Sequence, residues 1–86
     1  MEDHAKQLIH AKIVELARGL GRDARGLGFD QEIPPTGFLD SAAIIELILW
    51  LEAQFDLSIP QEDLNLANFG TIDATAEYLR RAGAIR

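Results

Sequence analysis

The segment from Ser41 to Phe55 constrains the fold most, because it is apolar on almost every side of the helix that it predicts. Apolar residues recur along it at i, i+3, i+4, i+7 and i+11, the spacing of a helix that buries one face. Ile45 and Leu49 lie outside that face and form a second stripe that begins at Ser41. In a small domain, such a second face is either covered by another segment or kept for a partner. Trp50 is correspondingly either packed or an interface anchor.

A first helix is predicted over residues 3–18, with Asp3 as its N-cap and Gly19 as its stop. Residues 19–39 then carry a density of glycine and proline that suits neither helix nor strand. A connection of this length is unusual in a compact domain. We expect an ordered crossover, held to the core by the large apolar side chains Leu27, Phe29, Ile33, Phe38 and Leu39.

After the long apolar helix, Pro60 marks a break and a short helix is predicted over residues 61–66. Residues 68–70 read as a turn, and Thr71 is the expected cap of a last helix over residues 72–81. The predicted fold is all-α. It is a small four-helix bundle with three longer helices, a short third helix and a long first loop, built as one domain over residues 1–86.

The charges are strongly segregated along a chain whose formal net charge is −6. Every lysine and arginine lies in residues 1–25 or 80–86. The intervening segment carries carboxylates alone, a distribution that disfavours nucleic acid and attracts basic protein surfaces. Solubility alone would also explain it. The ten carboxylates are Asp30, Glu32, Asp40, Glu46, Glu52, Asp56, Glu62, Asp63, Asp73 and Glu77.

Several kinds of site are disfavoured by what the sequence lacks. There is no cysteine, which excludes disulfides and thiolate zinc sites and is compatible with the cytoplasm. His4 and His10 are six residues apart and so lie on different helix faces, and we expect no metal site. No run of 18 apolar residues exists, so no membrane span is expected. No catalytic base is evident near Ser41, so we expect no catalytic residues.

Asp40 and Ser41 stand at the start of the apolar helix, shortly after the turn glycine Gly37. Alone, an Asp-Ser pair in this position is ordinary capping, because both side chains satisfy unpaired N–H groups. The positive end of a helix dipole also suits a phosphate ester, so a serine here can serve as a modification site.

The segment G-F-L-D-S-A-A-I-I-E-L-I-L-W-L-E-A-Q-F-D-L-S-I-P resembles the acyl carrier protein superfamily. In that family a D-S pair opens the second helix, an E-L pair follows five residues after the serine, and E-x-x-F and I-P close the helix and lead to the short third helix. The corresponding residues here are Asp40-Ser41, Glu46-Leu47, Glu52 to Phe55 and Ile59-Pro60. The resemblance continues to the end of the last helix, at Phe69, Thr71, Tyr78 and Leu79.

The resemblance implies that Ser41 carries 4′-phosphopantetheine, transferred from coenzyme A by a phosphopantetheinyl transferase. The thiol of that arm would hold an acyl or aminoacyl group as a thioester. Asp40 would cap the helix and contribute to recognition by the transferase. The chain would then be a non-catalytic monomer that visits an amino-acid- or acyl-activating ligase and downstream acyl-transfer enzymes. Those partners would dock on Ala42, Ile45, Leu49 and Trp50, inside an ionic rim formed by Glu46, Glu52, Glu62 and Asp63.

Two departures from fatty-acid-synthase carriers favour an aminoacyl cargo. Ala42 is smaller than the leucine usual after the serine, and Trp50 is bulkier than its usual counterpart. Both ends of the segment are similar to those of free-standing D-alanyl and aminoacyl carriers. The alternatives are a fatty-acid or polyketide carrier, a helical interaction module that docks through residues 41–55 without any arm, and an enzyme with Ser41 as its nucleophile.

Overall fold

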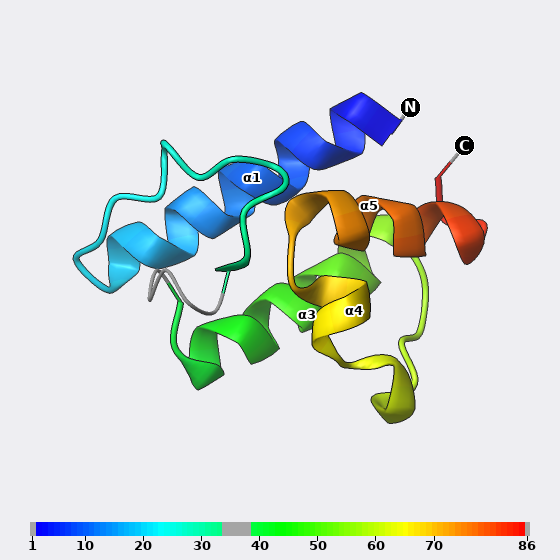
Figure 1. Cartoon of the computed structure of the whole chain (residues 1–86). Helices are drawn as coiled ribbons and strands as arrows, with labels where there is room; N and C mark the ends of the chain where they lie inside the picture. Colours follow the sequence, from blue (N-terminus) through cyan, green and yellow to red (C-terminus); the bar gives the residue numbers. More distant parts are fainter. Residues whose placement is uncertain (1, 34–38, 86) are drawn as a thin grey trace.

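The computed structural model describes residues 2–33 and 39–85, and over these residues the chain is helical, with no strand. The long helices are α1 (Glu2–Gly19), α3 (Ser41–Phe55) and α5 (Ile72–Arg81), and the short elements are the 3₁₀ turn η1 (Gln61–Asp63) and α4 (Leu66–Phe69). Helix α1 packs against both α3 and α5, and α4 packs against α5 (Figure 1). The predicted all-α bundle is thus confirmed.

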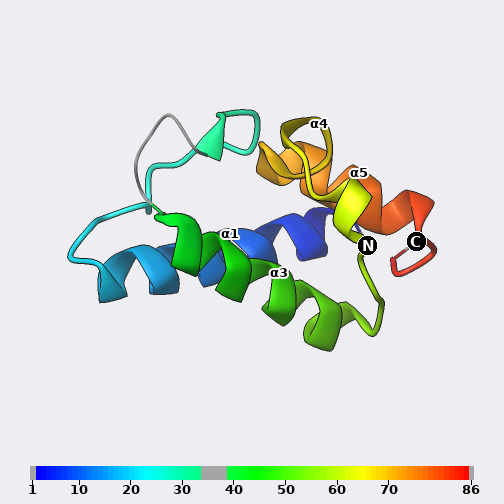
Figure 2. The ribbon, with the colours of Figure 1, turned by 90° about the horizontal axis from the view of Figure 1, so that it is seen from below.

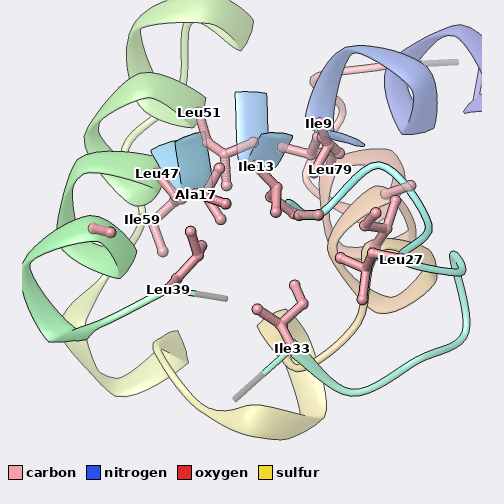
Figure 3. Packing of buried hydrophobic residues seen from close by; sticks show 14 residues of the cluster. Ile9, Ile13, Ala17, Leu27, Ile33, Leu39, Leu47, Leu51, Ile59 and Leu79 are labelled. Carbon is pink, nitrogen blue, oxygen red and sulfur yellow. The ribbon is translucent and has the colours of Figure 1, made fainter. Parts of the chain in front are cut away.

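The hydrophobic core lies where the three long helices meet. Ile13 of α1, Leu51 of α3 and Leu79 of α5 are completely buried and point toward one another (Figure 3). Burying a side chain of this size stabilises the fold by about 1.5–3 kcal/mol. Of the face of α3 that the apolar spacing predicts, Leu47 and Leu51 are buried, and Ile44, Ile48 and Phe55 are partly buried against the core. Ala43, outside the predicted face, is buried as well.

The crossover between α1 and α3 is held to the core as expected. Ile33 is buried, and its backbone N–H donates to the carbonyl of Gly70 at 2.7 Å. The carbonyl of Phe29 accepts a hydrogen bond of 2.9 Å from the N–H of Asp73. Leu27 and Leu39 are also buried, and Phe29 is partly buried against the core. Phe38, with the adjoining residues 34–37, lies outside the described residues.

The ends of α1 differ from the prediction. The helix begins at Glu2, so Asp3 lies within it and is not its N-cap. At the other end, Gly19 is the last helical residue, and the chain turns back two residues later at Gly21, whose φ is +75°. The N–H groups of Gly21 and Arg22 donate to the carbonyls of Arg18 and Ala17, at 3.0 and 2.8 Å. This pair of bonds is a Schellman motif, which needs a left-handed residue at the position of Gly21.

The short helix predicted over residues 61–66 begins at residue 61 as predicted but ends earlier than predicted. The structure has η1 up to Asp63 and then a separate helix, α4, which contains two of the residues predicted as a turn, Asn68 and Phe69. The reason is Asn65, whose side chain accepts from the N–H of Asn68 at 2.9 Å and so caps a new helix. The cap predicted at Thr71 is confirmed, since its hydroxyl accepts from the N–H of Ala74 at 2.9 Å.

A polar contact fastens η1 to α5. The hydroxyl of Tyr78 donates to a carboxylate oxygen of Asp63 at 2.7 Å. The Tyr78 ring also lies 4.8 Å from that of Phe69, and the guanidinium of Arg81 lies over it at 5.8 Å. The bond to Asp63 is the largest cause that raises the pKa of Tyr78 to about 12, followed by desolvation. Tyr78 therefore holds both η1 and α4 against the last helix.

Two leucines on α3 provide a matched test of its two faces. Leu51 is fully buried, whereas Leu49 is 60% exposed. Replacing Leu51 by alanine leaves a cavity and should lower the free energy of unfolding by about 2–5 kcal/mol. The same change at Leu49 should lower it by less than about 1 kcal/mol. Urea unfolding followed by circular dichroism measures both, and equal losses would contradict the assignment of the faces.

Tyr78 is the only tyrosine, so the absorbance of its phenolate reports its ionisation directly. Its pKa in the folded chain, about 12, exceeds the ordinary value of 10.0. The folded state therefore keeps a proton that the unfolded state releases. The resulting stabilisation is complete below pH 10 and is lost as the pH rises toward 12.

The variant Asp63→Asn removes the negative charge beside the hydroxyl and should move the midpoint back toward 10. The loss of stability at alkaline pH should weaken with it. A spectroscopic titration in which wild type and variant share one midpoint would show that the contact with Asp63 does not govern Tyr78.

Candidate functional site

Ser41 is the first residue of α3, and the residue before it performs the capping. Asp40 has an extended backbone, and its carboxylate accepts a hydrogen bond of 2.8 Å from the N–H of Ala43. Its carbonyl accepts the next bond, from Ile44 at 2.9 Å. The side chain of Ser41 is exposed, and within the described residues its hydroxyl makes no hydrogen bond. Capping is thus confirmed for Asp40, and the hydroxyl of Ser41 is free for another use.

The surroundings of that hydroxyl suit an anionic ester. Asp40 occupies the N–H of Ala43, which leaves the N–H groups of Ser41 and Ala42 without an acceptor among the described residues. Unpaired N–H groups and the positive end of the helix dipole stabilise a nearby phosphate. A group attached to the exposed oxygen can extend into solvent without moving the core.

The second stripe of α3 is exposed, as one of the two alternatives required. Ile45 and Leu49 are each 60% exposed, and Ala42 is exposed beside Ser41. No described part of the crossover covers this stripe. Trp50 lies apart from it: the indole is half-buried against the core and meets the ring of Phe55 edge-on, with the centroids 6.0 Å apart. The buried part of Trp50 thus packs against the core, and its role in partner binding stays a prediction.

An apolar groove of about 440 Å³ lies beside the exposed stripe. One side is formed by α3, including Ile45 and Leu49, and the other by the segment from η1 to α4, including Leu64 and Leu66. The two leucines are 44% and 65% exposed. Ile45, Leu49, Leu64 and Leu66 are called the apolar patch below.

Leu64 and Leu66 are not among the docking residues predicted from the sequence, because a continuous helix was expected there. The signal that could have found them is the spacing of Asn65 and Asn68, which is typical of an N-cap and its partner N–H. Because one helical turn ends at Asp63 and the next helix begins at Leu66, Leu64 and Leu66 do not lie on the buried face of one continuous helix. Both are exposed.

The four predicted rim carboxylates fall into two groups. Glu46 and Glu62 are exposed and make no ion pair within the described part of the chain. Glu52 instead accepts a hydrogen bond of 2.8 Å from the N–H of Ile59, which fixes the chain after α3. Asp63 is bound to Tyr78. Two rim carboxylates are therefore available at the surface, and the other two hold the walls of the groove.

The described residues show neither a metal-binding cluster of histidine and carboxylate side chains nor a helix long and apolar enough to cross a membrane. The candidate site has three features, on α3 and the segment beside it. They are a free hydroxyl at the start of α3, an apolar patch along it and a groove that the patch borders.

Comparison with known proteins agrees with this geometry. Residues 12–79 match the family model described as a phosphopantetheine attachment site. Two D-alanyl carrier proteins, from strains of Lactobacillus delbrueckii subsp. bulgaricus, are each 28% identical over 74 residues, which cover 85% of this chain and 91% of theirs. No solved structure matched the chain significantly.

The family match spans α3 and most of the remaining helical elements, so it covers the whole of the site. Proteins of this family hold 4′-phosphopantetheine covalently and serve as carriers, not as catalysts. The readings as an arm-less interaction module and as a serine enzyme are accordingly set aside. The chain belongs to the phosphopantetheine-binding carrier proteins of the acyl carrier superfamily.

Proposed function

We propose that the chain carries its 4′-phosphopantetheine on the hydroxyl of Ser41. The observation that carries the proposal is that Asp40, and not Ser41, caps the start of α3. Asp40 caps the helix through its 2.8 Å bond to Ala43, so the exposed hydroxyl of Ser41 is not needed for the fold. Asp40 also stands next to the reacting oxygen, where a transferase would meet it.

In the proposed modification, the Ser41 oxygen attacks the phosphorus of coenzyme A that bears the pantetheine. A new phosphodiester bond forms, the pyrophosphate bond breaks, and adenosine 3′,5′-bisphosphate leaves. The proton of the hydroxyl passes to a base of the transferase, because the neighbouring carboxylate of Asp40 is engaged in capping the helix. The terminal thiol of the arm then carries the cargo as a thioester.

The two serines of the chain give a matched test, since Ser41 and Ser58 are both exposed. The protein is incubated with coenzyme A, Mg²⁺ and a broad-specificity phosphopantetheinyl transferase, and intact mass is measured. Wild type and Ser58→Ala should each gain one phosphopantetheine, and Ser41→Ala should gain none. Modification of Ser41→Ala, or an unchanged wild type with a positive-control carrier modified in parallel, would overturn the proposal.

The proposed cargo is an aminoacyl group. The D-alanyl carrier relatives support this choice, as do Ala42 and Trp50 on α3. A fatty-acyl cargo is the second candidate, and the apolar groove favours it, because burying methylenes drives a chain out of water. In the aminoacyl reading the groove instead receives side chains of a partner. We place the carrier in the cytoplasm, as the cysteine-free sequence suggests, and as a monomer.

Stability of acylated forms separates the two cargoes. A transferase of broad specificity can attach the octanoyl or acetyl form of the arm from the corresponding acyl-coenzyme A. A chain buried in the groove would raise the free energy of unfolding of the octanoyl form by several kcal/mol over the acetyl form, at roughly 0.8 kcal/mol per methylene. We expect a difference below about 1 kcal/mol by urea unfolding. A larger gain would replace the aminoacyl cargo by a fatty one.

The docking surface for the transferase, for a ligase that activates the amino acid and for downstream acyl-transfer enzymes is proposed to be the apolar patch with Ala42. Four large exposed apolar side chains on two neighbouring elements exceed what a surface usually shows in one place. Glu46 and Glu62 add charge that steers basic partners. Trp50, Glu52 and Asp63 support this surface from within through the contacts described above.

Reversing the two exposed rim charges tests the steering. The double variant Glu46→Lys, Glu62→Lys should be modified by the transferase about tenfold more slowly at low salt, with unchanged helicity. The control, Glu15→Lys with Glu32→Lys, reverses two exposed carboxylates that lie outside α3 and η1, and should be modified at nearly the wild-type rate. Equal slowing of both variants would assign the effect to net charge and remove the rim from the docking surface.

A further inference from the structure

A hollow of about 400 Å³ lies at the C-terminal end of α1, outside the site described above. Its lining contains three arginines and one carboxylate, in an acidic protein. The three arginines are exposed at its edge. The lining residues are Val14, Arg18, Gly21, Arg22, Asp23 and Arg25.

The hollow is formed by the turn that follows α1, at Gly21. The left-handed Gly21 folds the backbone over the end of α1, so that Arg22 and Arg25 come to the same hollow as Arg18. Arg25 is then held by Asp23, whose two carboxylate oxygens accept from its Nε at 3.0 Å and from a terminal nitrogen at 2.9 Å. The pairing leaves Arg18 and Arg22 as the two arginines of the hollow without a carboxylate partner among the described residues.

Arginines near a helix C-terminus are stabilised by the negative end of the helix dipole, and this alone can explain their presence. The arginines at the end of α5 provide a comparison. Arg80 binds Glu77, and Arg81 donates to Asn68 and lies over Tyr78, so both are engaged by their own chain. Arg18 and Arg22 differ, because their guanidinium groups bind no acceptor within the described residues. Their donors remain available to a partner.

The position of the hollow relates it to Ser41. Helices α1 and α3 run in opposite directions, so the C-terminal end of α1 lies at the same end of the bundle as the start of α3 (Figures 1 and 2). Between Arg25 and Arg80 the chain has no basic residue. An enzyme that reaches Ser41 from this end would therefore meet an acidic helix and a separate basic hollow.

We propose that the hollow binds acidic side chains of a partner enzyme. A planar guanidinium matches a carboxylate with two parallel hydrogen bonds, and an open hollow of this size admits one or two side chains. A partner with a basic surface against α3 and an acidic one against the hollow can bind in a single orientation about Ser41. That orientation rests on Ser41 as the attachment site, whereas the binding of carboxylates by the hollow does not.

The test uses the full-length chain, labelled with ¹⁵N, and a tetraglutamate peptide as the probe. The peptide should shift the Nε–H resonances of Arg18 and Arg22 saturably, and the shifts should disappear in high salt. The variant Arg22→Gln should weaken binding roughly three- to tenfold. Lys12→Gln, which removes one charge from α1 outside the hollow, should bind like wild type. Thermal unfolding of both variants confirms that the fold is kept.

Other outcomes overturn the proposal. They are an absence of saturable shifts, equal weakening by Lys12→Gln, or shifts caused by inorganic pyrophosphate or coenzyme A but not by the peptide, which would make the hollow a small-phosphate site. The mass measurement on Ser41 is independent of this titration. A failure of the hollow and a failure of the attachment site are therefore distinguishable.

Discussion

The hydrogen bond from the N–H of Ala43 to the carboxylate of Asp40 is the contact on which the site depends. A helix needs its first N–H groups satisfied, and a serine at the junction would ordinarily do this. Because Asp40 does it instead, the hydroxyl of Ser41 has no structural duty. The proposed attachment at Ser41 would therefore leave the start of α3 intact, and the protein could fold before the arm is attached.

Helix α3 buries one face in the core and leaves the other face exposed. Leu47 and Leu51 enter the core, while Ile45 and Leu49 remain in water. The exposed apolar side chains add no hydrophobic stabilisation to the fold, and the free energy of unfolding of a chain of this size is small. The crossover offsets part of this loss, since its buried side chains and its hydrogen bonds to the start of α5 add to the core from outside the helices.

Much of this arrangement could be predicted from the sequence, because local rules govern it. The bounds of α3 and α5 and their caps at Asp40 and Thr71 follow from spacing and capping chemistry. The spacing also identifies the second apolar stripe of α3, but only the structure shows that it is exposed. The segment around Asn65 could not, since a polar side chain there ends one helix and starts another, and the apolar pattern does not record this. The arginine hollow also escaped prediction, because it depends on which of several nearby glycines takes the left-handed conformation.

The acidic charge opposes the self-association that the exposed apolar patch would otherwise favour. Four exposed large apolar side chains on a neutral protein would favour pairing of two copies through the same surface. The chain has a formal net charge of −6, and the carboxylates of Glu46 and Glu62 lie beside the patch. Two copies that approach through this surface therefore repel one another. Under the proposed function, the same charges would attract a basic partner enzyme to the patch. Exchange among several partners then requires only that each contact be weak enough to release.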